Sequence, residues 1–537
     1  MENGASLLRA TPFLLGVGGP PSSRERRTSR RSLGLSVSEP LDIVILGGGT
    51  AGWMAAAALV SLLPPDGWRV RLIESEEIGI VGVGEATFPE IRYFNDAIGI
   101  DEAEMLRATN GAFKLGIEFV DWGFKGSRYI HPFGVHGPPH MEHLFHHQWL
   151  RALQSGWKSD IGDYSFAAQA ARHCRFQFPE TGTAAVNSAY TYAYHFDASL
   201  YGAFLRGIAE QRGAVRMEGT VTEIIQHPDS GDIQSLRLKS GEVISGDFFL
   251  DCSGFRSLLL GETLGVRWED WSKWLVCDRA IALPSDRDEL SPYTRSTAME
   301  TGWRWRIPLQ HRTGNGYVFS SSFISEDKAA DSLIRSLETK VLAEPRVLKF
   351  QSGRRVASWA NNCVALGLAG GFLEPLESTS IYLVQVAIMQ LVPLLPGKRI
   401  DPRLRDEFNR LMDLQYERIR DFLILHYKLT RRDDSEIWRY CAAMDVPDSL
   451  SRKIKLFRRN GIIEKYKDGL FTPTSWLSVF VGQGLIPENY SSVADAVPQE
   501  KLISQLHAFR TEVRDRVDEM LPHDRFIDRY CAAQVSR

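Results

Sequence analysis

The hydrophobic pattern of the chain begins with an apolar run, a glycine-rich turn and a helix-forming segment in close succession. Residues 41–46 are mostly β-branched or apolar, which is typical of a buried strand. The turn Gly47-Gly-Gly-Thr-Ala-Gly52 follows, and residues 53–59 are rich in alanine. A second apolar run, residues 68–73, ends on Glu74. This order predicts strand, turn, helix and strand, the start of a Rossmann-type α/β domain.

The glycines of this turn have separate physical roles in such a unit. Gly47 lets the chain turn, Gly49 lets the backbone approach a pyrophosphate, and Gly52 lets the helix pack against the strand. The carboxylate of Glu74 is at the right distance along the chain to accept a hydrogen bond from a ribose hydroxyl. The motif does not choose between NAD and FAD, and a purely structural glycine turn is the alternative.

Later segments favour FAD. Residues 241–254 are interpreted as a hairpin strand, an apolar strand that returns to the cofactor fold, and an exit turn, Asp251–Gly254. Between the two parts, Tyr194–Leu205 is expected to form a helix that leads into a strand region at residues 215–224. Interleaving of cofactor and substrate segments is typical of two-domain FAD enzymes rather than of simple dehydrogenases. An ordinary strand and loop is the alternative.

Two indoles alternate with two guanidinium groups in the segment Gly302-Trp-Arg-Trp-Arg-Ile-Pro308. A strand has period 2, so Trp303 and Trp305 are expected on one face and Arg304 and Arg306 on the other. The aromatic face would form the wall of a site. The alternative is a half-buried strand with an exposed basic face.

The segment from His311 to Ser322 contains Asn315-Gly316 between apolar runs. This dipeptide is a strong turn signal, and it predicts a hairpin with its turn at that position.

The stretch Gly371–Ser380 carries two carboxylates, Glu374 and Glu377, ahead of the apolar segment 381–389. Pro375 and the residues Ser378, Thr379 and Ser380 are typical of a helix start, where backbone N–H groups are free and bind anions. A well-capped helix entry with solvated acids is the alternative.

The remaining patterns divide the chain into three parts. Residues 1–39 are rich in Gly, Pro, Ser and Arg, and we interpret them as a disordered leader or an upstream start codon, with a targeting signal as the less favoured alternative. Residues 40–400 are expected to form the cofactor-binding core with its interleaved substrate region. Apolar residues at helical spacing in 403–429 predict that residues 401–537 form a mainly helical region that caps the substrate side.

Composition narrows the class of protein. With 44% hydrophobic and 24% charged residues, the 537-residue chain has the profile of a soluble globular protein, and its net charge of −3 implies no nucleic-acid partner. No apolar stretch is long enough to predict a membrane span. Six scattered cysteines lack metal or disulfide spacing, so a reducing cytoplasm is expected.

Six histidines fall in one short, Gly/Pro-rich part of the chain. We expect no metal, because their spacing fits no standard ligand set and loop histidines are commonly exposed to solvent. The histidines are His131, His136, His140, His143, His146 and His147.

Three segments together resemble the flavin-dependent halogenases, whose best-known members chlorinate or brominate tryptophan. They are Gly47-Gly-Gly-Thr-Ala-Gly-Trp-Met-Ala55, the Gly302–Pro308 strand and the Gly371–Ser380 stretch. Gly82-Val-Gly-Glu-Ala-Thr87 and Asn110-Gly-Ala-Phe-Lys114 are also similar to family segments. The resemblance covers most of the chain, from about residue 42 to about 484.

The resemblance implies FAD as the cofactor and an FAD-binding fold like those of glutathione reductase and the flavin monooxygenases. It adds Thr50, Ala51 and Ala86 to the expected cofactor-binding residues. It implies that the reduced flavin comes from a separate NAD(P)H-dependent reductase. It also implies that Trp303 and Trp305 lie near the flavin and keep the organic substrate away from it.

The resemblance assigns catalysis to Lys114 and Glu377. In a largely apolar context a lysine is more often a surface residue whose amine reaches water. By the resemblance, the Lys114 ammonium instead hydrogen-bonds hypohalous acid or becomes a haloamine. Glu377 stabilises the cationic arenium ring and takes its proton.

The resemblance also places chloride or bromide at the backbone N–H groups of Thr379 and Ser380. Relatives specific for tryptophan usually carry glycine at position 380, so the serine side chain is expected to alter this site.

The clamp residues that hold free tryptophan in relatives cannot be matched in the C-terminal region, so we expect a simpler indole or another small arene as substrate, either free or tethered to a carrier protein. A flavin monooxygenase that hydroxylates its substrate is the second hypothesis. A flavin carrier without turnover is the third.

Overall fold

The structure is a computed structural model that describes residues 40–76, 84–141, 144–180, 186–397, 399–466 and 469–533. The leader proposed at residues 1–39 lies outside these ranges. So do residues 82 and 83 of the family-like segment and His143 of the histidine group.

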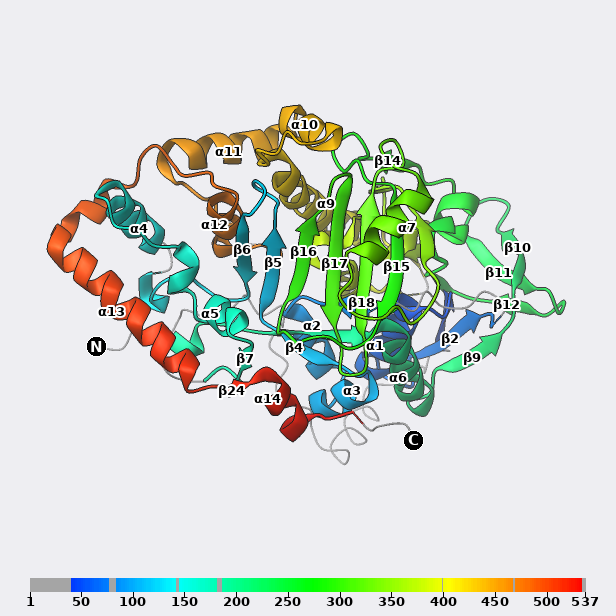
Figure 1. Cartoon of the computed structure of the whole chain (residues 1–537). Helices are drawn as coiled ribbons and strands as arrows, with labels where there is room; N and C mark the ends of the chain where they lie inside the picture. The colour runs from blue at the N-terminus through cyan, green and yellow to red at the C-terminus, as the bar shows by residue number, and fades with distance from the viewer. Residues whose placement is uncertain are drawn as a thin grey trace, which may run out of the picture.

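A parallel sheet lies next to helix α1, in the part of the chain where the sequence predicts cofactor binding (Figure 1). Its strands are ordered β21-β22-β13-β1-β2-β9, and all neighbours pair in parallel except β21 and β22. The strands are β1 (Leu41–Leu46), β2 (Trp68–Glu74), β9 (Val215–Glu218), β13 (Phe248–Asp251), β21 (Trp359–Ala360) and β22 (Cys363–Ala365). The predicted strand, turn, helix and strand at the start of the chain are confirmed, with α1 at Thr50–Leu62. The predicted return of residues 248–251 to this sheet is also confirmed, because Ile43 pairs with Phe248.

The expected helix at Tyr194–Leu205 begins later than predicted. Residues Ala193–Asp197 form strand β8, and the helix α6 covers Ala198–Gln211. Aromatic residues favour strands, and β8 is the middle strand of a sheet with β3 (Gly84–Ala86) and β4 (Ala112–Lys114). The Asp197 carboxylate then caps α6 by accepting from the N–H groups of Ser199 and Leu200.

A mixed sheet covers the opposite side of the site. Its strands are ordered β19-β15-β18-β17-β16-β5-β6, with β16 and β5 parallel. The strands are β5 (Gly116–Val120), β6 (Arg128–Pro132), β15 (Arg279–Ser285), β16 (Thr294–Ala298), β17 (Gly302–Pro308), β18 (Thr313–Phe319) and β19 (Arg346–Lys349). Figure 1 shows β16, β17, β18 and β15 side by side at the centre of the view.

The predicted turn at Asn315-Gly316 is wrong. Both residues lie inside β18, and the chain reverses between β17 and β18 at residues 309–312. Gly316 pairs with Trp305, and a Cβ on Gly316 would lie 1.9 Å from the indole ring. The glycine therefore makes room for an aromatic ring, and the buried Asn315 amide donates to Ser285 Oγ.

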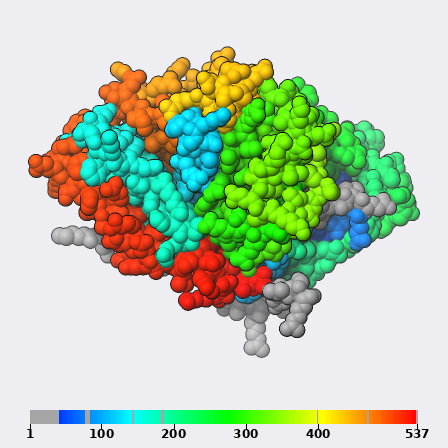
Figure 2. Space-filling view, in the orientation of Figure 1, coloured from blue at the N-terminus to red at the C-terminus, as the bar shows by residue number. Residues whose placement is uncertain are grey.

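The C-terminal part of the described chain is mainly helical, as predicted. Helix α9 starts after the cap Asp401, whose carboxylate accepts from the Arg403 N–H group, and has Pro402 in its first turn. The helices are α9 (Pro402–Lys428), α10 (Glu436–Ala443), α11 (Asp448–Asn460), α12 (Pro473–Gly482), α13 (Gln499–Asp518) and α14 (His523–Tyr530). Helix α12 packs on β6. In the space-filling view of Figure 2, the cyan atoms of the segment near residue 150 lie between the red and orange atoms of the C-terminal part and the green atoms of the middle of the chain. The boundary at residue 400 stays a prediction.

The remaining elements connect or cover these sheets. The helices are α2 (Glu90–Ala97), α3 (Glu102–Ala108), α4 (Phe145–Gln154), α5 (Phe166–Arg172), α7 (Glu326–Arg335) and α8 (Thr379–Leu391). The strands are β7 (Arg175–Phe176), β10 (Val221–Gln226), β11 (Ile233–Leu238), β12 (Val243–Ser245), β14 (Trp268–Asp270), β20 (Gly353–Arg355), β23 (Gly371–Phe372) and β24 (Leu521–Pro522). Among the described residues, no helix combines the length and the apolar character that crossing a membrane requires.

Candidate functional site

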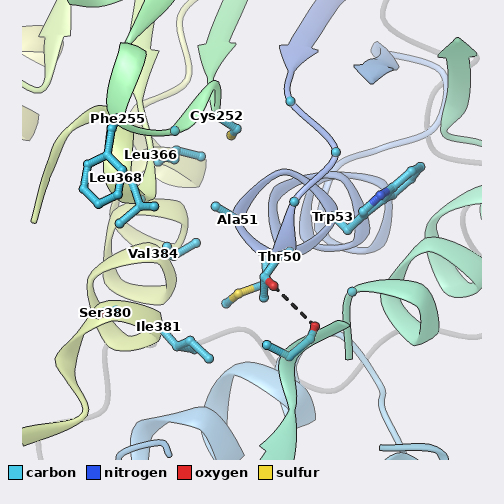
Figure 3. Close-up of a pocket in the computed structure, with 18 of the residues that line it drawn as sticks. Thr50, Ala51, Trp53, Cys252, Phe255, Leu366, Leu368, Ser380, Ile381 and Val384 are labelled. Atoms are coloured by element: carbon cyan, nitrogen blue, oxygen red, sulfur yellow. Dashed lines mark hydrogen bonds between the residues drawn. The ribbon is translucent and has the colours of Figure 1, made fainter. Parts of the chain in front are cut away.

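A cavity of about 820 Å³ opens at the carboxyl ends of β1 and β13. This volume is near the upper end of the range of roughly 300–1,000 Å³ for ligand pockets. Figure 3 shows the start of α1, with Thr50 and Ala51, on one side and α8, with Ser380, Ile381 and Val384, on the other. All seven residues predicted to bind the cofactor are brought together here, because Gly47, Gly49, Thr50, Ala51, Glu74 and Ala86 line the cavity and Gly52 lies under the turn.

The glycine turn fits a pyrophosphate. Gly47 has φ +116°, and a Cβ there would lie 2.2 Å from the Cys252 carbonyl oxygen, so only glycine is tolerated. Gly49 has no atom within 4 Å of an added Cβ and leaves its backbone open toward the cavity. A Cβ on Gly52 would lie 1.9 Å from the Gly47 carbonyl oxygen. The free N–H groups at the start of α1 therefore face a space suited to a dinucleotide phosphate.

Glu74 lies at the end of β2, where the ribose contact is expected. Its carboxylate accepts from Trp53 Nε1 at 3.2 Å and from the Arg216 guanidinium, and it lines the cavity. Its contact with a ribose hydroxyl stays a prediction.

Lys114 is completely buried at the end of β4. Its Nζ donates to the Thr87 carbonyl oxygen at 2.9 Å and to Ser378 Oγ at 2.8 Å. Burial lowers the pKa of Lys114 to about 7, against the opposing charges of Glu377 and Glu85. At neutral pH this amine is therefore present in both its charged and its neutral form.

Ser378 connects Lys114 with the large cavity. It lines the cavity while its hydroxyl accepts from the lysine, whereas neither Lys114 nor Glu377 is part of the cavity wall. Its backbone is left-handed, with φ 59°, because the chain turns there from the short 3₁₀ helix Pro375–Glu377 into α8.

The carboxylate of Glu377 is fully buried between two histidines. His131 Nδ1 of β6 lies 2.9 Å from Oε2, and His426 Nε2 of α9 lies 2.9 Å from Oε1. Burial alone would raise the pKa of Glu377, but the two imidazoles outweigh it and bring the pKa to about 2. The predicted partnership with Lys114 therefore acts through space, while the direct contacts of Glu377 are with imidazoles.

Two further carboxyl groups, Glu85 and Glu374, have raised pKa values. Glu85 of β3 lines the cavity, and burial raises its pKa to about 7 against the charge of Lys114. Burial raises the pKa of Glu374 to about 7 as well, although Trp303 Nε1 donates to its Oε2 at 2.9 Å and the Tyr427 hydroxyl donates to the same oxygen at 2.7 Å.

The two predicted indoles share one face of β17, with ring centroids 6.1 Å apart. Trp305 lines the cavity, whereas Trp303 is buried against Glu374 and Trp122. The opposite face is not the exposed basic face of the alternative interpretation, because Arg306 is buried and ion-paired with Asp288.

The start of α8 at Thr379 confirms the predicted helix start. Ser380 lines the cavity, and the buried Thr379 has a side-chain oxygen without a hydrogen-bond partner in the described part of the chain. The N–H groups of a first helical turn lack helical partners, so the physics of an anion site is present. Halide binding here stays a prediction.

The five described histidines of the sequence group do not form one exposed loop cluster. His131 lies in β6 and His146 and His147 lie in α4, and these three and His136 are buried. In the described ranges, no three His, Cys, Asp or Glu residues are grouped so that they could hold a metal ion.

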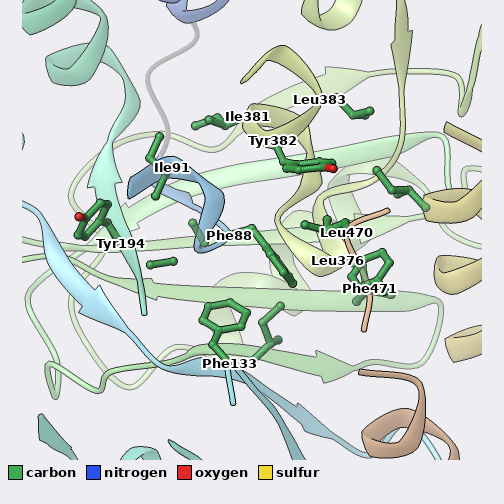
Figure 4. Close-up of a cluster of buried hydrophobic side chains, with 14 of the residues drawn as sticks. Phe88, Ile91, Phe133, Tyr194, Leu376, Ile381, Tyr382, Leu383, Leu470 and Phe471 are labelled. Carbon is green, nitrogen blue, oxygen red and sulfur yellow. The ribbon is translucent and has the colours of Figure 1, made fainter. Parts of the chain in front are cut away.

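Aromatic side chains pack beside Lys114. Its Nζ lies 5.1 Å from the centroid of the Phe133 ring, and Phe88 contacts both Phe133 and Phe471 edge-on, at 4.8 and 5.7 Å between centroids. Figure 4 shows Phe88, Phe133 and Phe471 gathered with Leu376 in this cluster.

The sequence did not indicate the roles of three functional candidates, namely Glu85, His131 and His426. The alternation H-P-F at residues 131–133, at the end of β6 and just beyond it, is a weak signal that His131 and Phe133 share one face. His426 falls inside a long helical pattern, and Glu85 inside a short segment, so neither had a signal of its own.

Comparisons with known proteins agree with this site. The model of the family described as tryptophan halogenase matches residues 42–499. Tryptophan 7-halogenase KtzQ of Kutzneria sp. (strain 744) is 35% identical over 518 residues, covering 89% of this chain and 95% of that protein.

Two solved structures extend the comparison. The flavin-dependent halogenase Xcc4156 from Xanthomonas campestris has a TM-score of 0.90 at 44% identity, with 93% of this chain and all of that chain covered. BrvH, a flavin-dependent halogenase from Brevundimonas sp. BAL3, has a TM-score of 0.88 at 41% identity, with 91% of this chain and 99% of that chain covered.

Proposed function

Since the chain belongs to the tryptophan halogenase family of flavin-dependent enzymes, we propose that it halogenates an indole or a similar electron-rich arene beside Lys114. The observation that carries this proposal is the burial of the Lys114 amine next to, but outside, a dinucleotide-sized cavity. Ser378 lines the cavity and accepts a hydrogen bond from Lys114, which supports passage of the halogenating species beside this residue.

The cavity suits FAD through its glycine turn, the start of α1 and the carboxylate of Glu74. Reduced FAD, when bound, supplies hypohalous acid from dioxygen and chloride or bromide. A separate NAD(P)H-dependent reductase delivers the reduced flavin. The N–H groups of Thr379 and Ser380, at the start of α8, hold the halide at the cavity wall.

Lys114 receives the hypohalous acid. Its ammonium donates a hydrogen bond to the oxygen of the acid, or its neutral amine forms a nitrogen–halogen bond while water leaves. A pKa of about 7 makes both forms available near neutral pH. In the hydrogen-bonded form, the carbon–halogen bond forms as the oxygen–halogen bond breaks, and the lysine proton converts the leaving hydroxide into water.

Glu377 completes the reaction. Its carboxylate stabilises the positive charge of the arenium ring and then takes the proton from the halogenated carbon, so that the electron pair of that bond restores the aromatic ring. An arenium ring is a strong acid, so a weak base that is always ionised is sufficient. The low pKa of Glu377 meets this requirement.

Trp305 and Trp303 keep the arene away from the flavin. The Trp305 indole belongs to the cavity wall, and Trp303 is fixed behind it by the hydrogen bond to Glu374. The aromatic cluster of Phe88, Phe133 and Phe471 supports a neutral arene as substrate, because rings pack favourably against an aromatic guest.

The test is an assay of the purified protein with a flavin reductase, NADH, FAD, bromide and indole, with free tryptophan assayed in parallel. We expect monobromoindole, recognised by its bromine isotope pair in mass spectrometry. Lys114→Ala should abolish this product and leave FAD binding intact. Oxygenated product without bromide would instead support a monooxygenase, and FAD binding without either product would support a carrier.

A further inference from the structure

His426 is a buried titratable group that the proposed mechanism does not use. It lies near the C-terminal end of α9 and is fully buried. Its Nδ1 is 2.9 Å from the Phe422 carbonyl oxygen, one helical turn earlier, and its Nε2 is 2.9 Å from Glu377 Oε1. The second contact is not a well-aligned hydrogen bond, since neither atom has a hydrogen-bond partner of good geometry in the described residues.

The two contacts of His426 determine where its protons are. A carbonyl oxygen only accepts hydrogen bonds, so Nδ1 must carry a proton and donate to Phe422. In a neutral imidazole, Nε2 would then present a lone pair to a carboxylate oxygen at 2.9 Å, which is repulsive. A protonated ring makes this contact favourable even without good hydrogen-bond alignment, because the positive imidazolium attracts the carboxylate at 2.9 Å.

His131 needs no such extra proton. Its Nδ1 donates to Glu377 Oε2, and its Nε2 is buried without a hydrogen-bond partner among the described residues. A neutral imidazole with its proton on Nδ1 satisfies this arrangement. Of the two imidazoles that contact Glu377, His426 is therefore the one whose contacts require a positive charge.

We propose that His426 is a positioning residue that carries a proton on Nε2 toward Glu377, so that the two side chains form an internally neutral ion pair. The pair keeps the carboxylate ionised in a dry site and fixes Oε1, while His131 fixes Oε2. The part of this inference that concerns catalysis rests on the proposed function.

The pairing also changes the environment of Lys114. The other titratable groups that face the Glu377–His426 pair are Lys114 from β4 and His131 and Tyr129 from β6. With the charge of Glu377 balanced by His426, it attracts the lysine proton less. The neutral amine of Lys114, the form that can make a nitrogen–halogen bond, is therefore more available at neutral pH.

Nitrogen-15 NMR of the histidine-labelled enzyme tests the proton directly and does not depend on any halogenation. We expect both ring nitrogens of His426 to be protonated at pH 7.5, and one of them to lose its proton in Glu377→Gln. His426→Gln assigns the signals. A single protonated nitrogen in the wild-type enzyme would overturn the proposal.

His523 is the matched internal control for this measurement. It is buried, and its Nδ1 also contacts a carbonyl oxygen, that of Leu290 at 2.7 Å. Its Nε2, however, accepts from the Phe113 N–H group at 3.2 Å. One donor and one acceptor require a neutral ring, so His523 should show one protonated nitrogen in the same spectrum, whatever the state of Glu377.

A pH profile separates positioning from simple packing. In His426→Phe, the balancing charge is lost, so the pKa values of Glu377 and Lys114 should both rise. The pH at which Lys114 changes its protonation state sets a midpoint in the pH profile of kcat, and this midpoint should then move upward by about one pH unit or more. A profile that is lowered but not shifted would mean that His426 only fills space, and would overturn the proposal. His523→Phe should leave the midpoint where it is in the wild type.

Discussion

At the scale of the residue, the site depends on one amine that is kept away from water. Lys114 is fully buried, and its two hydrogen-bond partners, the Thr87 carbonyl and the Ser378 hydroxyl, are neutral groups. A neutral acceptor compensates a buried charge only partly, which is why the pKa falls. Reactivity at this position is therefore obtained at the expense of stability.

Replacing Lys114 with methionine should make the protein more stable, most of all at low pH. The folded-state pKa of about 7 lies below that of the unfolded chain, so the charged lysine destabilises the folded state fully below pH 7. Between pH 7 and about 10, the unfolded chain still binds the proton and the folded protein does not, so the cost declines. We expect a gain of roughly 1–3 kcal/mol in the free energy of unfolding at pH 6.

Urea denaturation of both proteins at pH 6 and pH 9 measures this difference. The gain from Lys114→Met should shrink between the two values. An equal gain at both would mean that the amine does not titrate in this range in the folded protein.

Residue roles were only partly predictable from the sequence. Lys114 and Glu377 could be named because their motifs resemble those of a known family, although they are 263 positions apart in the chain. The sequence places His131 in a group of histidines in a Gly/Pro-rich segment, and His426 has no sequence signal that sets it apart. Contacts of Glu377 with one strand and one distant helix arise from tertiary packing, which leaves no periodic trace in the sequence.

At the scale of the element, the pair of strands β17 and β18 shows how local rules can conflict. Asn-Gly favours a tight turn, but the turn falls at residues 309–312 instead. Trp305 requires a partner without a side chain on the neighbouring strand, and Gly316 provides it. Packing against Trp305 at the cavity wall, and not a tight turn of the backbone, is therefore what requires glycine at position 316.

Gly316→Ala should disturb both stability and cofactor binding. The new Cβ would overlap the Trp305 ring, so the indole must move toward the cavity that it lines. We expect a loss of roughly 2 kcal/mol or more in the free energy of unfolding and a severalfold weaker affinity for FAD, measured by quenching of flavin fluorescence.

Gly207→Ala is the control, because a Cβ at this position in α6 meets no atom within 4 Å. It should be neutral or stabilising by up to about 1 kcal/mol. If Gly316→Ala matched the control in stability and in FAD affinity, the claim that Gly316 makes room for the Trp305 ring would be wrong.

At the scale of the whole molecule, the C-terminal helices are joined to the mixed sheet close to the site. Arg432, in the connection after α9, is buried and donates to the Ala298 carbonyl at the end of β16 and to the carboxylate of Asp434. Helix α9 itself brings His426 to Glu377. The sequence predicted a helical region over the substrate side, but it could not predict which side chains join the two parts.

Arg432→Met should loosen this connection. Removing the guanidinium leaves the Ala298 carbonyl without this donor, and the Asp434 carboxylate then keeps the exposed Lys125 amine, 3.1 Å away, as its ionic partner. We expect a loss of roughly 2–4 kcal/mol in the free energy of unfolding. The exposed neighbour Arg431 is the matched control, and Arg431→Met should change stability by less than about 1 kcal/mol. Thermal or urea unfolding of the two variants checks this, and equal losses would argue against the buried connection.

The interleaved architecture was the most predictable feature at this scale. Apolar strands at residues 41–46, 68–73 and 248–251 were each recognisable, and they form neighbouring strands of one parallel sheet. The site between that sheet and the mixed sheet was not derivable from periodicity, because it is built from segments that are distant in the chain.

The separation of the arene from the flavin is the central claim, and a crystal structure with FAD and indole bound together tests it most directly. We expect the isoalloxazine ring in the large cavity beside Trp305, and the indole ring against Phe133 within contact distance of Lys114 Nζ and Glu377. An indole stacked directly on the isoalloxazine ring, away from Lys114, would contradict the account.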